Sequence, residues 1–122
     1  MMSQNPASVE VTDLVVVTND DSFVQYLDMS STVPVIALVY SSTDLPSREL
    51  ETNLDRLVRE CAGKLMLVTV DAQTSPGVVS ALQVRALPTV VALIGGQLAP
   101  LFEGVQVEST LVTVLNKVLE TD

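Results

Sequence analysis

The sequence predicts an α/β fold in which a mixed β-sheet is flanked by helices on both faces. Short apolar, β-branched runs alternate along the chain with segments whose apolar residues repeat at helical spacing. A Gly-Gly pair separates the last two apolar runs, and this is the signal for a tight hairpin of antiparallel strands. The expected element order is therefore β-α-β-α-β-α-β-β-α, with parallel strands in the rest of the sheet.

The predicted domain begins with a strand and a short helix. Residues 1–12 are polar and lack periodicity, so we expect a flexible N-terminal arm followed by one domain at residues 13–120. Leu14–Thr18 is a β-branched run typical of a strand. Thr18 and Asp21 have the spacing of a capping box, which predicts a helix that ends near Asp28.

A fully apolar strand and a long helix come next. Val35–Tyr40 is apolar throughout, as in a strand that is buried on both faces. Pro46–Ala62 has helical periodicity, and Gly63 follows it in the usual position after a helix. The apolar stripe of this helix consists of Leu50, Leu54, Leu57, Val58 and Cys61.

The middle of the chain predicts two further strands on either side of a short helix. Leu65–Asp71 and Thr89–Ile94 are both apolar runs of strand length. Between them, Ser75 and Pro76 are typical of a helix start, and the helix should run to about Leu82.

The chain is expected to finish with a hairpin strand and a helix. Gly95-Gly96 leads into a strand at Leu98–Glu103, and Pro100 within that run indicates the edge of the sheet. The last helix should span about Val107–Leu119. Its apolar face consists of Leu111, Val114, Leu115, Val118 and Leu119.

Composition excludes several classes of partner. The chain has 122 residues, which fits one domain, and 48% hydrophobic residues, which is ample for a core. Fifteen acidic residues stand against six basic ones, so the formal net charge is −9. A nucleic acid or an anionic membrane surface attracts basic proteins, so we expect neither as a partner.

The residue types that are missing exclude much of enzyme chemistry. The sequence has no histidine, which rules out Ser-His-Asp and Cys-His catalysis and every zinc site with a histidine ligand. Its one cysteine, Cys61, cannot form an internal disulfide or a CxxC pair. We expect no metal and no cofactor. A lone cysteine and the lack of a signal-peptide pattern or membrane-spanning run predict a cytoplasmic protein.

The element order and several segments resemble the thioredoxin family along about residues 13–120. The most specific match is Val84–Val90, which resembles the family segment whose proline is cis and faces the active site. The resemblance therefore implies a cis bond between Leu87 and Pro88. The other matching segments are Thr18–Phe23, Val70-Asp71 with Pro76, Gly95–Gln97 and Phe102–Gly104.

The chain departs from this family at the active site. Thr43–Ser47 stands where the family has Trp-Cys-Gly-Pro-Cys, so Pro46 is kept and the two cysteines are replaced by Asp44 and Ser47. Disulfide reduction needs a reactive thiolate and a second thiol to resolve the mixed disulfide. Leu38 and Leu67 stand at the places where, by resemblance, the family buries an acid and a lysine.

Leu87–Leu93, Gly96-Gln97 and Phe102–Val107 resemble more narrowly the bacterial YbbN-type family, the chaperedoxins. In these proteins a thioredoxin domain without the full CxxC motif precedes tetratricopeptide (TPR) repeats and acts as a co-chaperone. The resemblance implies a binding module for unfolded or partner protein segments, with TPR repeats in a longer parent chain as a further possible partner.

The resemblance also implies a shallow apolar groove for an extended segment. Three loops would form its walls. The expected groove residues are Tyr40, Thr43, Asp44, Leu45, Pro46, Ala86, Leu87, Pro88, Gly104 and Val105.

Each candidate residue has a plainer interpretation. Cys61 is either a reactive thiol or, as we favour, a core residue in register with the helix stripe. Asp44, Glu49 and Glu51 are either a carboxylate site or, as we favour, acids placed at a helix N-terminus. Ser47 lacks an identifiable base, which argues against a nucleophile. The apolar face of Leu111–Leu119 is expected to be core rather than a partner's docking site.

Two other functions stay open. One is a thiol-disulfide oxidoreductase that acts through Cys61 or through thiols of a partner. The other is a purely structural domain of a larger chain.

Overall fold

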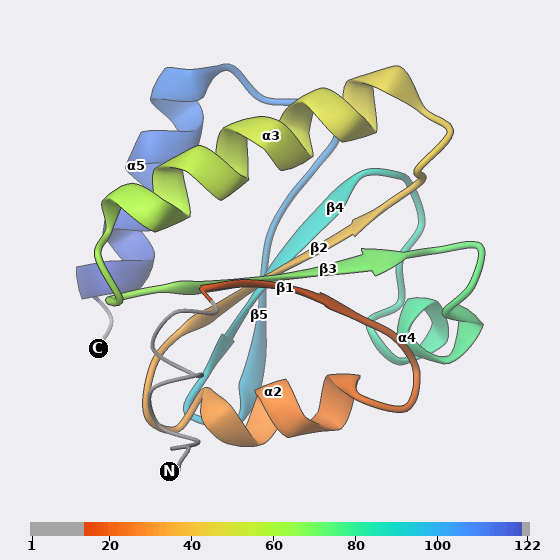
Figure 1. The fold of residues 1–122 in the computed structure, drawn as a ribbon, viewed down its shortest axis with the longest axis horizontal. Helices are drawn as coiled ribbons and strands as arrows, with labels where there is room; N and C mark the ends of the chain where they lie inside the picture. The colour runs from red at the N-terminus through yellow and green to blue at the C-terminus, as the bar shows by residue number, and fades with distance from the viewer. Residues whose placement is uncertain (1–13, 121–122) are drawn as a thin grey trace, which may run out of the picture.

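Five strands form one sheet between two layers of helices in the computed structural model, which describes residues 14–120 (Figure 1). The expected arm at residues 1–12 lies outside the described residues. The elements are β1 (Val15–Thr18), α2 (Phe23–Met29), β2 (Val35–Tyr40), α3 (Leu45–Glu60), β3 (Met66–Asp71), α4 (Pro76–Ala81), β4 (Thr89–Ile94), β5 (Gln97–Glu103) and α5 (Glu108–Glu120). The predicted order and α/β class are confirmed.

The strands are arranged in the order β1-β3-β2-β4-β5. β1, β3 and β2 are parallel, whereas β4 is antiparallel to both β2 and β5. The sequence predicted the antiparallel pair of the hairpin and missed the second one, because an apolar run shows that a strand is buried but carries no sign of its direction. Pro100 lies on the edge strand β5, as expected.

Each face of the sheet carries its own apolar core. α3 and α5 cover one face, and α2 and α4 cover the other (Figure 1). The predicted stripes on α3 and α5 are confirmed as core for most of their members, whereas Cys61 and Leu119 are only partly buried and Val114 is not part of the core. The first core includes Ile36, Leu38, Leu50, Leu54, Val58, Leu67, Leu111 and Leu115, and the second includes Phe23, Val35, Ala37, Val39, Val68, Val70, Val78 and Leu93.

The structure corrects two expected helix boundaries. The Thr18–Asp21 capping box is wrong, because α2 begins at Phe23 and the turn before it is held by the Asn19 side chain. The Asn19 amide oxygen accepts from the backbone N–H groups of Asp21 (2.9 Å) and Ser22 (3.1 Å). α3 ends at Glu60 rather than near Ala62, because Ala62 has a φ of +54° and has left the helical conformation.

The short helix α4 is capped by a residue from a distant loop. Ser75 precedes α4, yet its side chain makes no capping hydrogen bond. The carboxylate of Asp20 instead accepts from the N–H groups of Gly77 (3.0 Å) and Val78 (2.8 Å). A Cβ on Gly77 would lie 3.0 Å from that carboxylate, so a larger residue would force the Asp20 side chain to shift. The contact fixes the β1–α2 loop against α4.

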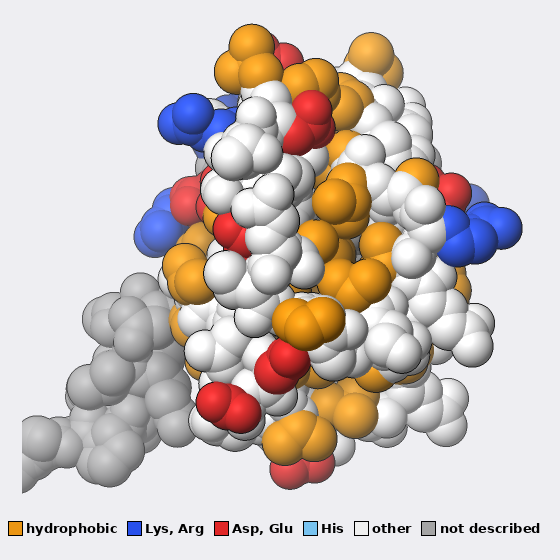
Figure 2. All heavy atoms as spheres, turned by 90° about the vertical axis from the view of Figure 1, so that its right-hand side faces the viewer, with side chains coloured by type: hydrophobic (Ala, Val, Ile, Leu, Met, Phe, Trp, Pro, Cys, Tyr) orange, Lys and Arg blue, Asp and Glu red, His pale blue; other side chains and the backbone are white. Residues whose placement is uncertain are grey.

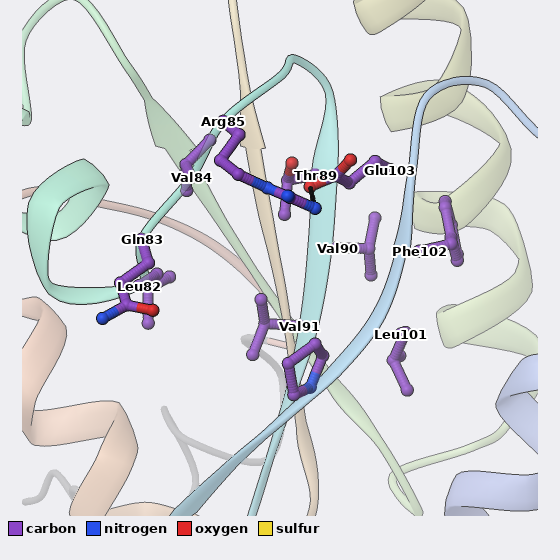
Figure 3. Close-up of a pocket in the computed structure, with 11 residues that line it drawn as sticks. Leu82, Gln83, Val84, Arg85, Thr89, Val90, Val91, Leu101, Phe102 and Glu103 are labelled. Carbon is purple, nitrogen blue, oxygen red and sulfur yellow. Dashed lines mark hydrogen bonds and ion pairs between the residues drawn. The ribbon is translucent and has the colours of Figure 1, made fainter.

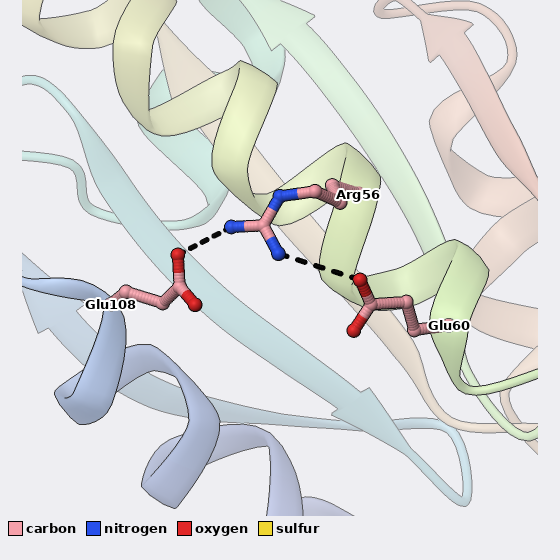
Figure 4. Close-up of polar contacts among 3 residues, drawn as sticks. All are labelled: Arg56, Glu60 and Glu108. Carbon is pink, nitrogen blue, oxygen red and sulfur yellow. Dashed lines mark hydrogen bonds and ion pairs between the residues drawn. The ribbon is translucent and has the colours of Figure 1, made fainter.

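An exposed ion-pair cluster links the two helices on the other face. The Arg56 guanidinium contacts Glu60 of the same helix at 3.4 Å and also contacts Glu108 at the start of α5 (Figure 4). Exposed pairs of this kind add little stability, so the α3–α5 layer depends mainly on its apolar core. None of the helices described is long and apolar enough to span a bilayer.

Candidate functional site

Three loops meet at one end of the sheet because of the strand register. β2 ends at Tyr40, β4 begins at Thr89 and β5 ends at Glu103. Val39 pairs with Thr89, and Thr89 pairs with Glu103. The segments that follow β2, precede β4 and follow β5 are therefore neighbours. They contain the residues expected to form the groove except Tyr40, which is the last residue of β2.

The first loop ends in a capped helix. Asp44 lies just before α3, and its carboxylate accepts from the Ser47 N–H (3.1 Å) and from the Ser47 hydroxyl (2.8 Å). Pro46 lies in the first turn of α3, where its missing N–H is not needed. The two positions that carry cysteines in thioredoxins thus hydrogen-bond to each other and hold the start of this helix.

The second loop presents its backbone. The Leu87–Pro88 peptide bond is cis, as the resemblance predicted. Thr89 donates its hydroxyl to the Ala86 carbonyl at 2.5 Å, and the Pro88 carbonyl accepts from Gly104. Neither the N–H nor the C=O of Leu87 has a hydrogen-bond partner within residues 14–120. These groups remain available to a bound segment.

The third loop is joined to the second by one hydrogen bond. The Gly104 N–H donates to the Pro88 carbonyl at 2.7 Å. Gly104 has a φ of +81°, which glycine adopts readily and other residues do not. Val105 follows it and is 50% exposed.

Exposed apolar side chains come from all three loops. Leu45 is 64% exposed and Leu87 is 39% exposed, which together with Val105 makes one apolar residue from each wall. Figure 2 views this end of the molecule and shows hydrophobic side chains gathered in the middle of the face. The expected walls are therefore assembled from apolar surface at the ends of β2, β4 and β5.

Tyr40 forms the inner side of this region. It is half-buried and packs against the core beneath α3 and α5. Burial raises the pKa of its hydroxyl, and the nearby carboxylates of Glu51 and Asp71 raise that pKa further, whereas Arg48 lowers it. Tyr40 is therefore a neutral side chain near a region of negative charge.

The sheet interior behind the site contains no charged pair. Leu38 is fully buried, and the residue beside it in the register is Thr69, also buried. Leu67, which stands by resemblance at the place of the family's buried lysine, pairs with Ile36 and is fully buried in the same core as Leu38. Both of these positions therefore carry uncharged, buried side chains.

Ser47 and the nearby carboxylates lie in the first turns of α3. The Ser47 hydroxyl has a carboxylate partner, but Ser47 is completely buried and cannot reach a substrate. Glu49 is exposed, and burial followed by the charge of Asp55 raises the pKa of Glu51. Across residues 14–120, no three metal-binding side chains converge.

Cys61 lies at the far end of α3. It is the C-cap of the helix and is only partly exposed, packed against the first core. The expectation of a core residue therefore holds in part. Asp44 and Cys61 are separated by the length of α3, about 25 Å at 1.5 Å per residue, so this thiol lies far from the groove.

A hollow that the sequence did not indicate adjoins the groove. It has a volume of about 610 Å³ and lies between the segment after α4 and the two hairpin strands (Figure 3). Val91 and Pro100 lie beside each other in it, and an ion pair between Arg85 and Glu103 (3.2 Å) crosses its end nearest the groove. A β-bulge opposite Val90 and Val91 shapes this edge, and bulges carry no sequence signal without a glycine.

The fold and this site together define a class of protein. It is a thioredoxin-fold domain in which Asp44 and Ser47 stand where, by resemblance, thioredoxins carry their two active-site cysteines. With one cysteine in its whole sequence, it is not a CxxC dithiol reductase.

The chain belongs to the thioredoxin family, since the family described as Thioredoxin matches residues 14–117. It is 30% identical over 110 residues to "Thioredoxin M-type, chloroplastic" of Zea mays, a match that covers 90% of this chain and 65% of the maize protein. It is 29% identical over 98 residues to "Thioredoxin 1" of Nostoc sp., covering 80% of this chain and 91% of that protein.

A third relative is much longer than the region it shares with this chain. An uncharacterized protein of Mycobacterium tuberculosis is 36% identical over 77 residues, which are 63% of this chain and 25% of the mycobacterial protein. The chain thus spans less than two thirds of the maize protein and a quarter of the mycobacterial one.

Proposed function

We propose that this protein is a redox-inactive thioredoxin-fold module that binds extended apolar segments of unfolded or partner proteins, as a co-chaperone or adaptor. The observation that carries the proposal is the unpaired backbone of Leu87, which lies on the loop that also exposes the Leu87 side chain. The neighbouring loops expose Leu45 and Val105. An extended segment can hydrogen-bond to that backbone as a strand of one residue, while its side chains contact Leu45, Leu87 and Val105.

The state of the old active site supports a binding role without redox chemistry. The Asp44 carboxylate and the Ser47 hydroxyl are committed to each other at the start of α3. The site keeps its shape through this pair and carries no group that attacks a disulfide. We also propose a cytoplasmic location, which suits a lone and partly exposed cysteine.

The narrower proposal is a YbbN-like co-chaperone, whose parent chain would add TPR repeats. The segments at Leu87–Leu93 and Phe102–Val107 form β4, β5 and the third wall of the groove, so the resemblance falls on the site itself. The mycobacterial relative supports the view that related domains occur inside longer chains.

Binding at this groove should be weak. Two backbone hydrogen bonds and three partly exposed apolar contacts contribute a few kcal/mol in total, and association carries its own entropic cost. A dissociation constant of 1 μM requires about 8 kcal/mol, so we expect micromolar or weaker affinity. Weak and sequence-tolerant contact suits unfolded clients.

The reduction of insulin by dithiothreitol, followed by turbidity, is one assay that distinguishes the three candidate functions. Reduction of insulin releases a chain that aggregates, and turbidity reports it. A reductase shortens the lag, a binding module lengthens the lag or lowers the plateau, and an inert structural domain does neither. We expect the second behaviour from the wild-type protein in molar excess, and a shortened lag would contradict the proposal.

Two matched variants place the effect on the groove. Leu87→Asp should abolish the protection. Leu98→Asp places the same charge at a similarly exposed leucine (45%) beside the hairpin turn at the opposite end of β5, and should keep it. Cys61→Ser should also keep the protection against aggregation. Loss of protection in this variant would favour the oxidoreductase alternative.

A further inference from the structure

Several carboxylates lie at the groove end of the sheet. Acidic residues are found in the segments after β1 and β2 and at the last positions of β3 and β5. These are Asp20, Asp21, Asp44, Asp71 and Glu103. In Figure 2, acidic side chains border the apolar middle of this face, and the basic ones lie at its rim.

Few cations offset this charge. Arg85 is paired with Glu103, which leaves Arg48 as the other basic residue in the segments around the groove. Arg56 and Arg59 are engaged by carboxylates along α3. Lys64 precedes β3, at the other end of the sheet.

Two of these carboxylates, Asp71 and Asp44, are contacted by neutral hydrogen-bond donors and form no ion pair within the described residues. Asp71 accepts from the Ser42 hydroxyl (2.9 Å) and the Gln73 N–H (2.9 Å), both neutral donors. Asp44 likewise accepts only from Ser47. Asp71 lies beside Tyr40 in the sheet register, one strand spacing away. Burial is the main cause of the raised pKa of Tyr40, and the charges of Glu51 and Asp71 raise it further against a smaller opposing effect of Arg48, in agreement with the excess of acids near this residue.

From this arrangement we propose that the groove selects extended segments in which apolar side chains are flanked by lysine or arginine. The inference rests on the proposed function and specifies its client chemistry. Apolar side chains of the client contact Leu45, Leu87 and Val105, and the flanking cation lies near Asp71 and Asp44. The excess of acids disfavours segments with acidic flanks, because like charges at the site repel.

Three labelled peptides test the preference. They share one length and one central Leu-Val-Leu core, and differ only in two flanking residues, which are lysine, glutamine or glutamate. Fluorescence anisotropy at low salt should show the lysine peptide about two- to fivefold tighter than the glutamine peptide, as expected for exposed charge pairs, and the glutamate peptide weaker than both. The differences should shrink at 0.5 M NaCl.

Charge variants locate the preference. Asp71→Asn should reduce the advantage of the lysine peptide and leave the glutamine peptide unchanged. Asp28→Asn is the control, because it removes the same charge near Ser30, which contacts the hairpin turn at the opposite end of β4. Leu87→Gln adds no charge and should weaken all three peptides.

Equal affinities for the lysine and glutamine peptides would overturn the inference and leave the proposed function standing. Equal effects of Asp71→Asn and Asp28→Asn would also overturn it, since the preference would then come from net charge alone. If Leu87→Gln binds the lysine peptide as well as the wild type does, the cation binds elsewhere and the inference is wrong. Binding of none of the peptides contradicts the proposed function itself.

Discussion

Asp44 holds the start of α3, at a position that by resemblance carries a cysteine in thioredoxins. Its carboxylate caps α3 through the N–H and hydroxyl of Ser47. A side-chain oxygen at this position satisfies a backbone donor that the helix cannot pair internally. Asp44 therefore has a structural role as the cap of this helix.

Replacing Asp44 tests this role directly. Asp44→Ala should lower the free energy of unfolding by about 1 kcal/mol, because the cap is lost, whereas Asp44→Ser should lose only a fraction of that. Urea denaturation followed by circular dichroism measures both. Equal losses in the two variants would mean that the cap is not what the carboxylate contributes.

Cys61 should react slowly with thiol reagents in the native protein. Burial raises the pKa of its thiol, and Glu60 raises it further, whereas the opposing effect of Lys64 is smaller. The thiolate is the reactive form, so alkylation of the native protein should rise at higher pH than alkylation of the urea-unfolded chain. Mass spectrometry of samples quenched at a series of pH values measures the extent of alkylation of the native and the unfolded protein. Fast labelling of the native protein at neutral pH would contradict this account and revive the redox alternative.

Among the elements, α4 depends most on a distant contact. It has six residues, too few to be stable alone, and its first N–H groups donate to Asp20 of the β1–α2 loop. Asp20→Ala should cost about 1 kcal/mol, as for other caps. Asp21→Ala removes the same charge from the adjacent position and should have little effect.

Gly77→Ala should also be destabilising, because its new Cβ would lie 3.0 Å from the Asp20 carboxylate. The two substitutions should be coupled: in the Asp20→Ala background the added methyl meets no carboxylate, so it should cost less. A double-mutant cycle measured by thermal or urea unfolding provides the coupling. Strict additivity would show that the contact does not hold α4.

The sequence predicted elements well where one physical signal dominates. The apolar runs at Val35–Tyr40 and Thr89–Ile94 coincide with β2 and β4, because full burial imposes continuous apolarity. The capping of α2 and α4 was missed, since Asn19 and Asp20 act through a turn and a tertiary contact. The direction of β4 was missed for the same reason, because it depends on packing and leaves no local pattern.

The candidate site was predictable only through resemblance. The three walls came from matching segments around Thr43–Ser47, Ala86–Pro88 and Gly104-Val105, and the register of the sheet places them together. No residue pattern indicated the hollow beside Val91 and Pro100, which depends on a bulge and on the path of the chain after α4.

At the scale of the whole molecule, the two ends of the sheet differ in chemistry. The end where the three loops meet combines the unpaired backbone of Leu87, exposed apolar residues and carboxylates such as Asp44 and Asp71, which form no ion pair within the described residues. The lone thiol lies at the other end of α3. The net charge of −9 helps to keep a complex with an apolar client in solution.

A backbone NMR titration with an apolar peptide tests the central claim most directly. Chemical shift changes should concentrate at residues 43–47, 86–88 and 104–105, where the three walls of the groove meet. Leu87→Asp should remove them while the rest of the spectrum shows an intact fold. Changes confined to the α2 and α4 face or to the hairpin turn, or no changes at millimolar peptide, would contradict the account and leave a purely structural domain.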